Sequence, residues 1–172
     1  MIKPDECYVN LGCSTVIQNY FDTNLNNLEY GKHLEFAVSL IPRDVYLSEP
    51  LLKEVDTQHK ILRCAIMRLD KYRCYNWHID KERGAGINLL LTPNIKSLVY
   101  FGERDTGSKY NISFIEMKYE PNTFYLFNTQ ISHTVYNFDE TRYVFTLEFE
   151  EDKDKLSFNQ LKEGVLKKYG SL

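Results

Sequence analysis

Between residues 61 and 150 the chain consists of short runs of β-branched and aromatic residues, separated by turn residues. Runs of this kind predict strands. No helical pattern comes between them, and eight strands of this kind suggest a sandwich or a jelly-roll barrel. The predicted strands are 61–69, 72–79, 85–92, 97–102, 110–118, 123–127, 132–137 and 142–150.

The flanking segments have a different texture. Residues 1–60 are irregular, with helical spacing at 28–40 and 46–57, and Ser48-Glu49-Pro50 is typical of a helix start. The tail at 155–169 carries a single apolar stripe with helical spacing. A chain of 172 residues fits one domain. We therefore expect a single domain, 1–172, with a helical or irregular N-terminal part at 1–60, a jelly-roll core at 61–150 and a C-terminal helix.

Charge and composition narrow the possible environments. The formal net charge of −3 argues against a broad electrostatic grip on nucleic acid, although a base held in a small pocket stays open. No apolar stretch approaches the length of a membrane span, and the N-terminus lacks the apolar run of a signal peptide. The cysteines form no C-x-x-C pair, so we expect free thiols in a reducing cytoplasm.

The last predicted strand divides its residues between two faces, because side chains alternate along a strand. One face carries Tyr143, Phe145, Leu147 and Phe149, and the other carries Arg142, Val144, Thr146 and Glu148. The aromatic face needs cover, which the terminal helices could provide. The other face would then line the barrel interior. A lone arginine is costly there unless it meets an anion, so Arg142 predicts an acidic ligand.

Three side chains with metal-ligand chemistry stand at the ends of predicted strands. His78 and Asp80 are two residues apart and should point the same way. His133 opens the seventh predicted strand, which neighbours the second in a jelly roll. Two histidines and one carboxylate are the facial set of non-haem Fe(II) oxygenases. Zinc enzymes with open sites also use three protein ligands, so this set alone does not choose the metal.

The presence of Arg142 favours iron over zinc as the metal. It follows His133 by nine residues and begins the last strand, which should place it deep in the barrel, across from the metal. A guanidinium binds a carboxylate through two parallel hydrogen bonds, a geometry that lysine matches less well. 2-Oxoglutarate can chelate iron through its 2-oxo acid end, and its distal carboxylate then needs a fixed cation. Arg142 is our candidate for that cation.

At this point the sequence resembles the Fe(II)/2-oxoglutarate oxygenase superfamily, over roughly residues 61–150. Within it, the chain looks closest to the aspartyl/asparaginyl β-hydroxylase-like group, which includes small proline hydroxylases. His78-Ile79-Asp80-Lys81-Glu82-Arg83, followed by Gly86-Ile87-Asn88-Leu89, is similar to that group's H-x-D-x-x-R and I-N-x-P. His133-Thr134-Val135-Tyr136-Asn137, followed by Thr141-Arg142-Tyr143-Val144, is similar to its H-x-V-x-N and R-x-V.

The resemblance implies a double-stranded β-helix (a cupin-like jelly roll) and a dioxygenase that couples oxidative decarboxylation of 2-oxoglutarate to hydroxylation of a substrate. It implies His78, Asp80 and His133 as catalytic iron ligands and Arg142 as the carboxylate anchor. Fe(II), 2-oxoglutarate and O₂ are the expected cofactors, with ascorbate as a candidate stimulant. The retained carboxylate ligand, Asp80, disfavours halogenation.

The chain departs from the group's pattern in two places. Leu90-Leu91 stands where the proline is expected, and Arg-x-Ser becomes Arg142-Tyr143-Val144. Because that serine is absent, the hydroxyl of another residue must contact the carboxylate of 2-oxoglutarate. Thr146 is a candidate, since it shares the strand face of Arg142. Asn88 is expected to point inward, where a bound oxo acid would satisfy its amide. Arg83 and Trp77 are the candidates for binding the substrate. The alternative for Arg83 is a solvated loop arginine, and the alternative for Trp77 is an aromatic side chain that excludes water.

The substrate class stays open among a small molecule, an amino-acid side chain of a peptide and an exposed nucleobase, with the first two favoured. Oligomeric state is not readable. The main alternative is a cupin-like metal-dependent isomerase or small-ligand-binding protein, although the H-x-H pattern of many cupins is absent. A non-catalytic interaction domain on the same fold is a further alternative, but it would be expected to lose at least one ligand.

Overall fold

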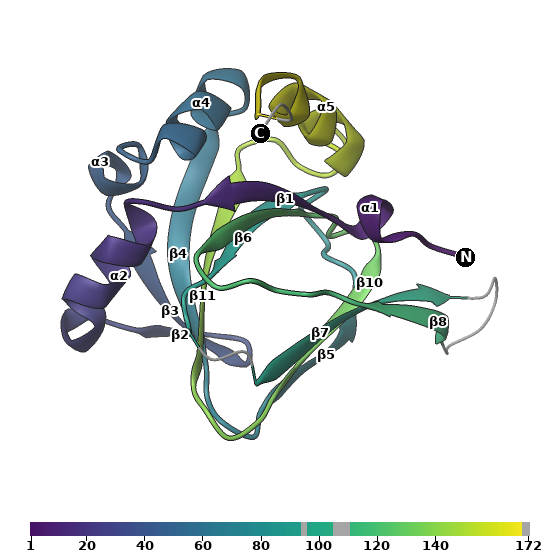
Figure 1. The fold of residues 1–172 in the computed structure, drawn as a ribbon, viewed down its shortest axis with the longest axis horizontal. Helices are drawn as coiled ribbons and strands as arrows, with labels where there is room; N and C mark the ends of the chain where they lie inside the picture. Colours follow the sequence, from purple (N-terminus) through teal and green to yellow (C-terminus); the bar gives the residue numbers. More distant parts are fainter. Residues whose placement is uncertain (94–95, 105–110, 170–172) are drawn as a thin grey trace.

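Two antiparallel sheets face each other in the computed structural model, which describes residues 1–93, 96–104 and 111–169 (Figure 1). The larger sheet has the order β1-β9-β6-β11-β4-β3-β2 and the smaller β5-β10-β7-β8. The larger contains β1 (Tyr8–Cys13), β2 (Gly31–His33), β3 (Phe36–Ile41), β4 (Ile61–Leu69), β6 (Gly86–Leu90), β9 (Thr123–Phe127) and β11 (Arg142–Phe149). The smaller contains β5 (Cys74–His78), β7 (Ser97–Arg104), β8 (Asn111–Glu116) and β10 (Ser132–Asn137).

The eight predicted strands correspond in order to β4 through β11, which confirms the mainly β, jelly-roll prediction. The helices are α1 (Pro4–Cys7), α2 (Ile17–Asn24), α3 (Arg43–Tyr46), α4 (Pro50–Gln58) and α5 (Phe158–Tyr169), with a 3-10 turn at Leu25–Asn27. The helix start at Pro50 is confirmed, with Glu49 as its N-cap residue, and so is the C-terminal helix. No helix among the described residues has the length and apolar character needed to cross a membrane.

The helical spacing at 28–40 gave a wrong prediction, since this segment forms the β2–β3 hairpin. Strand β3 pairs with β4, from Ala37 opposite Arg68 to Ile41 opposite Cys64. The strand is therefore stabilised by a partner distant in sequence, which local apolar spacing does not reveal. Strand β1 was not expected either. Its pairing with β9 is interrupted by a bulge near Gly12, where φ is 93° and glycine is favoured.

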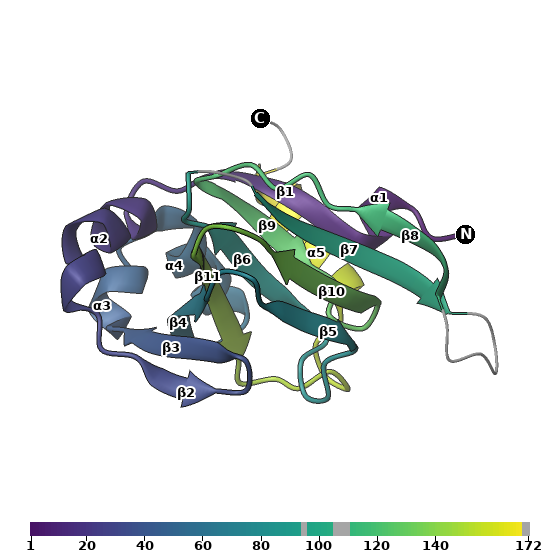
Figure 2. The ribbon, with the colours of Figure 1, turned by 90° about the horizontal axis from the view of Figure 1, so that it is seen from below.

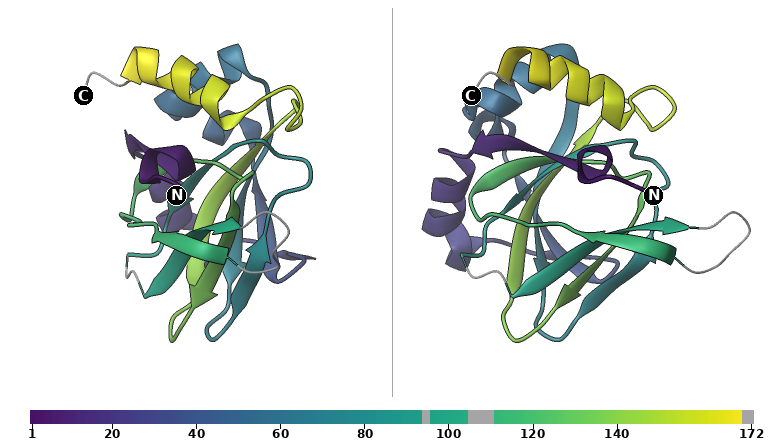
Figure 3. Two further views of the ribbon diagram at one scale, coloured as in Figure 1. Left: turned by 90° about the vertical axis from the view of Figure 1, so that its right-hand side faces the viewer. Right: turned by 45° about the vertical axis from the view of Figure 1, so that its right-hand side comes forward.

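The helices pack on one face of the larger sheet, as Figures 2 and 3 show for α2, α3, α4 and α5. On this side Phe145, Leu147 and Phe149 of β11 join one buried cluster with Leu52 of α4 and Leu161 of α5. The aromatic face of the last strand is therefore covered by helices, as predicted. Because this face is buried, the register of β11 is fixed, since a shift by one residue would turn its apolar side chains to the opposite face.

The opposite face of β11 looks into the space between the two sheets. A second buried cluster lies in this space. It includes Phe101 of β7 and Phe127 of β9, whose ring centroids are 4.5 Å apart. Arg142, Val144 and Thr146 of β11 line a cavity at the same level of the barrel. The alternation along one strand thus places apolar cover on one side and a polar cavity on the other.

Replacement of Phe145 by alanine should lower the free energy of unfolding by about 3–5 kcal/mol, because it leaves a cavity in the core. The ring is fully buried and contacts that of Phe124 edge-on, with centroids 5.8 Å apart. Urea denaturation followed by far-UV circular dichroism measures the change. Phe114→Ala is the matched control, since Phe114 is 68% exposed. A loss no larger than that of the control would contradict the packing described.

Candidate active site

The pairing of β5 with β10 brings the two candidate histidines together. His78 and His133 are direct partners across the two strands, and their ring centroids lie 4.1 Å apart. The second and seventh predicted strands are thus neighbours, as the jelly-roll topology required. The register shifts between His133 and Val135, which leaves one extra residue on β5. This bulge lets Tyr75 and His78 both line the cavity, although a regular strand would turn them to opposite faces.

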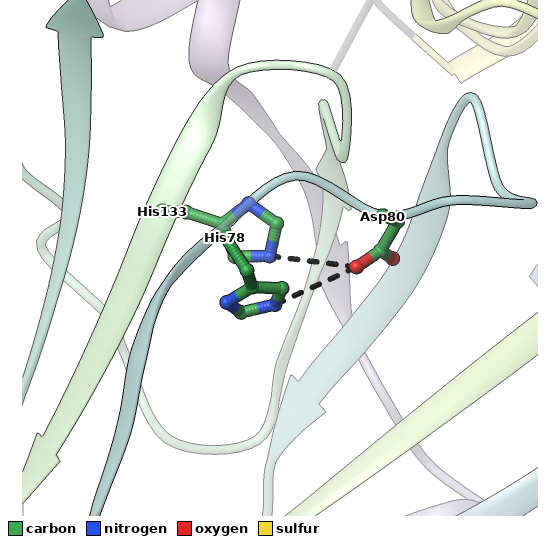
Figure 4. Close-up of side chains that lie close together, drawn as sticks. All are labelled: His78, Asp80 and His133. Atoms are coloured by element: carbon green, nitrogen blue, oxygen red, sulfur yellow. Dashed lines mark ion pairs between the residues drawn. The ribbon is translucent and has the colours of Figure 1, made fainter. Parts of the chain in front are cut away.

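Asp80 completes the cluster from the segment just after β5. Its backbone N–H donates to the carbonyl of Thr129 at 3.1 Å, which fixes the chain where the strand has ended. Its Oδ1 lies 3.5 Å from Nε2 of His78 and 3.9 Å from Nε2 of His133. Figure 4 shows the carboxylate and the two rings pointing toward one another. The three side chains predicted from sequence therefore converge.

Both imidazoles are oriented by their other nitrogen. Nδ1 of His78 lies 2.6 Å from the carbonyl oxygen of Asn76, and Nδ1 of His133 lies 2.8 Å from that of Ile131. A carbonyl only accepts, so each Nδ1 carries the proton and each neutral ring keeps its Nε2 lone pair for a metal. Burial is the main cause that lowers the pKa of His133 to about 4, which favours the neutral ring.

These observations fit a divalent transition metal. The three candidate donor atoms, one on each residue, lie within 4.8 Å of one another. Two imidazole nitrogens and one carboxylate oxygen form the donor set of a facial iron site, and they leave other coordination positions open. Bound metal would also hold together a carboxylate and two rings that otherwise make no hydrogen bond with one another.

A cavity of about 70 Å³ is lined by both histidines and by Arg142. This volume is well below the roughly 300–1,000 Å³ of pockets for drug-sized ligands, so the enclosed part of the site admits only a small group. Its apolar wall includes Phe36, Met67, Val99, Phe127, Val135 and Val144. Its polar groups come from Arg83, Asn88, Tyr119, Arg142 and Thr146 as well as the histidines.

Arg142 lies in this cavity with only 5% of its surface exposed. Its Nε donates to Oγ of Ser97 at 3.1 Å, and its guanidinium lies 5.6 Å from the centroid of the Tyr119 ring. Burial lowers the pKa of Arg142, although an arginine remains charged at neutral pH. None of the ion pairs among the described residues involves Arg142. Its charge is thus available to an anionic ligand.

Oδ1 of Asn88 and the hydroxyl of Tyr119 are buried in the same cavity, and neither makes a well-formed hydrogen bond with another described residue, although the side chain of Asn88 lies close enough to that hydroxyl to interact with it. Such groups are costly unless a ligand or water satisfies them. Burial raises the pKa of Tyr119, so its hydroxyl stays protonated and can donate to a carboxylate. Asn88 was expected here from its strand face. Tyr119 and Ser97 were not, because only the folded chain shows that they reach the guanidinium.

The other second-tier candidates have mixed outcomes. Thr146 lines the cavity, but its hydroxyl accepts a hydrogen bond from Nη1 of Arg83 at 3.2 Å. Arg83 itself turns to Asp80, with Nε 2.8 Å and Nη2 2.7 Å from Oδ2. Trp77 is not among the residues that line the cavity, since it directly precedes the cavity-lining His78 and alternation along β5 turns it to the other face. Direct contacts of these three with co-substrate or substrate stay predictions.

Comparison with known proteins reveals similarity of structure alone. No protein-family model and no curated protein sequence matches the chain. A Pseudomonas putida prolyl-4-hydroxylase superposes with a TM-score of 0.60 and 12% identity, over 84% of this chain and 92% of that one. HygX from Streptomyces hygroscopicus, solved with nickel, 2-oxoglutarate and hygromycin B bound, gives 0.62 and 9%, over 86% and 84%.

A third similar structure is a Trichoplax adhaerens prolyl hydroxylase in complex with a hypoxia-inducible factor peptide fragment. It gives a TM-score of 0.58 and 15% identity, over 83% of this chain and 82% of that one. At these identities the likeness establishes a shared fold. The chain therefore has the jelly-roll fold of 2-oxoglutarate- and Fe(II)-dependent oxygenases, in agreement with the predicted fold class.

The convergence of His78, Asp80 and His133 predicts tight binding of one divalent transition-metal ion. Replacement of His78 by alanine should weaken the affinity for Co(II) by more than about 100-fold, since even loss of outer-shell partners costs 10–100-fold. Isothermal titration calorimetry measures the dissociation constant. His33→Ala is the matched control, because His33 is exposed on β2. Equal affinities in the two variants would show that the metal binds elsewhere.

Proposed function

We propose that this chain is an Fe(II)- and 2-oxoglutarate-dependent dioxygenase that hydroxylates a small molecule or an amino-acid side chain. The observation that carries the proposal is the buried guanidinium of Arg142, in a cavity also lined by two of the candidate metal ligands. A buried cation with no carboxylate partner among the described residues predicts an anionic ligand. A dicarboxylic acid with a 2-oxo group suits both the metal ligands and Arg142. Its 2-oxo acid end can chelate the metal, and its distal carboxylate can pair with the guanidinium.

Each group of residues has a distinct part in this proposal. His78, Asp80 and His133 hold the metal, and Arg142 binds the distal carboxylate through its fork of N–H donors. The hydroxyl of Tyr119 donates a further hydrogen bond to that carboxylate. The amide of Asn88 meets the acid along its length, and Thr146 stays a candidate for a second hydroxyl contact. Bound Fe(II), with O₂ and 2-oxoglutarate, would supply the oxidising chemistry, with succinate and CO₂ as co-products.

The apolar wall of the cavity supports a reaction that needs protection from water. Phe36 packs against Tyr75 with ring centroids 5.0 Å apart, and Tyr75 contacts the ring of His78 at 4.1 Å. These rings cover one side of the candidate metal centre. Their place indicates that they exclude bulk water from the ligands and keep the neighbouring electrostatic interactions strong.

Within these oxygenases, we assign the chain to the aspartyl/asparaginyl β-hydroxylase-like group, because the motifs around His78 and His133 are similar to those of that group. Support for a small-molecule or peptide substrate comes from the structural neighbours: HygX was solved with hygromycin B, and a prolyl hydroxylase with a peptide fragment. The proposal includes O₂ as co-substrate, ascorbate as a stimulant and the cytoplasm as location. The reducing conditions of that compartment suit ferrous iron.

The first test is turnover without an added substrate. Protein mixed with Fe(II), ascorbate and 2-oxoglutarate should release succinate slowly, and His78→Ala should abolish the release. Chromatography with mass detection quantifies the succinate, and a panel of amino acids and peptides that stimulates the release identifies the substrate class. Absence of succinate release under every condition, from protein that binds the metal, would favour a cupin-like binder or isomerase instead.

Replacement of Arg142 by alanine should weaken 2-oxoglutarate binding by about 30-fold or more, because loss of one partner of a buried charge pair costs roughly 2–5 kcal/mol. The affinity of Arg142→Lys for 2-oxoglutarate should lie between those of the wild type and Arg142→Ala, since lysine keeps the charge but lacks the paired N–H donors of the guanidinium. Calorimetric titration of the Co(II)-loaded protein with 2-oxoglutarate gives the affinities. Arg63→Ala is the control, because Arg63 pairs with Glu148 on the surface. Unchanged affinity in Arg142→Ala would exclude Arg142 as the anchor.

A further inference from the structure

Asp80 has two carboxylate oxygens in different surroundings. Oδ1 lies 3.5 Å and 3.9 Å from the Nε2 atoms of His78 and His133. Oδ2 is held by Arg83 through Nε at 2.8 Å and Nη2 at 2.7 Å. Arg83 thus occupies one oxygen with a charge-assisted hydrogen bond from Nε and an ion-pair contact from Nη2, and it leaves the other oxygen facing the histidines.

The guanidinium of Arg83 is itself fixed from behind. Its Nη1 donates to Oγ1 of Thr146 at 3.2 Å and lies 3.5 Å from the carbonyl oxygen of Leu147, both on β11. An arginine that reached out to substrate would have to give up these contacts. Because the fork joins Asp80 to a strand in the middle of the larger sheet, it ties the loop carboxylate to a rigid element.

The backbone that carries Arg83 is held independently of its side chain. Its carbonyl oxygen accepts from Oγ1 of Thr129 at 2.5 Å and from Nε2 of Gln130 at 2.7 Å. The next residue, Gly84, packs so closely on the backbone carbonyl of Leu156 that a Cβ there would overlap it. A change confined to the Arg83 side chain should therefore leave the course of this loop intact, which makes its effect on Asp80 interpretable.

We propose that Arg83 is a positioning residue for the metal carboxylate rather than a contact to substrate. By holding Oδ2, it restricts Asp80 to one ligand oxygen and keeps the remaining coordination positions open for the 2-oxo acid and one further ligand. Its charge also offsets that of Asp80, so the metal centre remains attractive to a dianionic acid. This inference rests on the metal site of the proposed function, though not on its reaction.

Co(II) binding tests the inference without turnover. Arg83→Gln should weaken Co(II) affinity by about 10–100-fold, as outer-shell partners of metal ligands do. It should also change the visible absorption of bound Co(II), because freed Oδ2 alters the ligand arrangement. Arg83→Lys should recover part of the affinity, since it keeps the charge without the fork. Arg63→Gln, which breaks a surface pair with Glu148, should leave both measurements unchanged.

The same substitution in an Asp80→Ala background separates positioning from general support of the fold. If Arg83 acts through Asp80, then Arg83→Gln will not weaken the residual Co(II) affinity there, and loss of a positive charge near the metal should strengthen it. Equal weakening in both backgrounds, or unchanged affinity and spectrum in the Arg83→Gln single variant, would overturn the proposal. A wild-type chain without Co(II) affinity overturns the metal site as well. Tight Co(II) binding without succinate release counts only against the proposed reaction.

Discussion

The pairing of β5 with β10 is the constraint on which the candidate site depends. It places His78 directly opposite His133, and the bulge beside that pair turns Tyr75 toward the same cavity. Backbone carbonyls then fix both imidazoles, so that their Nε2 atoms face the carboxylate of Asp80. A shift of one residue in this register would turn one imidazole to the outer face of the sheet and disperse the cluster.

The second organising feature is a charge buried where the fold could have placed an apolar side chain. Arg142 lies between the sheets, where its side chain donates a hydrogen bond to Ser97 and has an aromatic ring beside it. Burial of a charge without a counter-charge lowers the stability of the fold. Such a cost is understandable if the cation serves a ligand, and the buried atoms of Asn88 and Tyr119 that make no well-formed hydrogen bond with the described residues fit that explanation. Under the proposed function, stability and ligand binding are therefore opposed here.

Local pattern predicted this molecule well where strands succeed one another and poorly where distant segments meet. The run at 142–150 divided correctly into a covered and a cavity face, because alternation is a property of the strand itself. The hairpin within 28–40 was mistaken for a helix, since its stability comes from pairing with β4. Trp77 was expected near the substrate but does not line the cavity, an outcome that alternation from the cavity-lining His78 already implies. Arg83 was a candidate contact to substrate, with a solvated loop arginine as the alternative, and its contact with Asp80 became evident only in the structure.

The sequence by itself determined the succession of the eight strands between residues 61 and 150, the chemistry of the three candidate ligands and the presence of an arginine on an inward face. These follow from alternation and short spacing, which act over a few residues. Only the tertiary structure decided that Nε2 of each histidine faces Asp80, that Arg83 divides the two oxygens of that carboxylate and that Tyr119 joins Arg142. Such contacts depend on register, bulges and the packing of one sheet against the other. These bring together residues far apart in the chain, and no local pattern encodes the atom that each side chain will present.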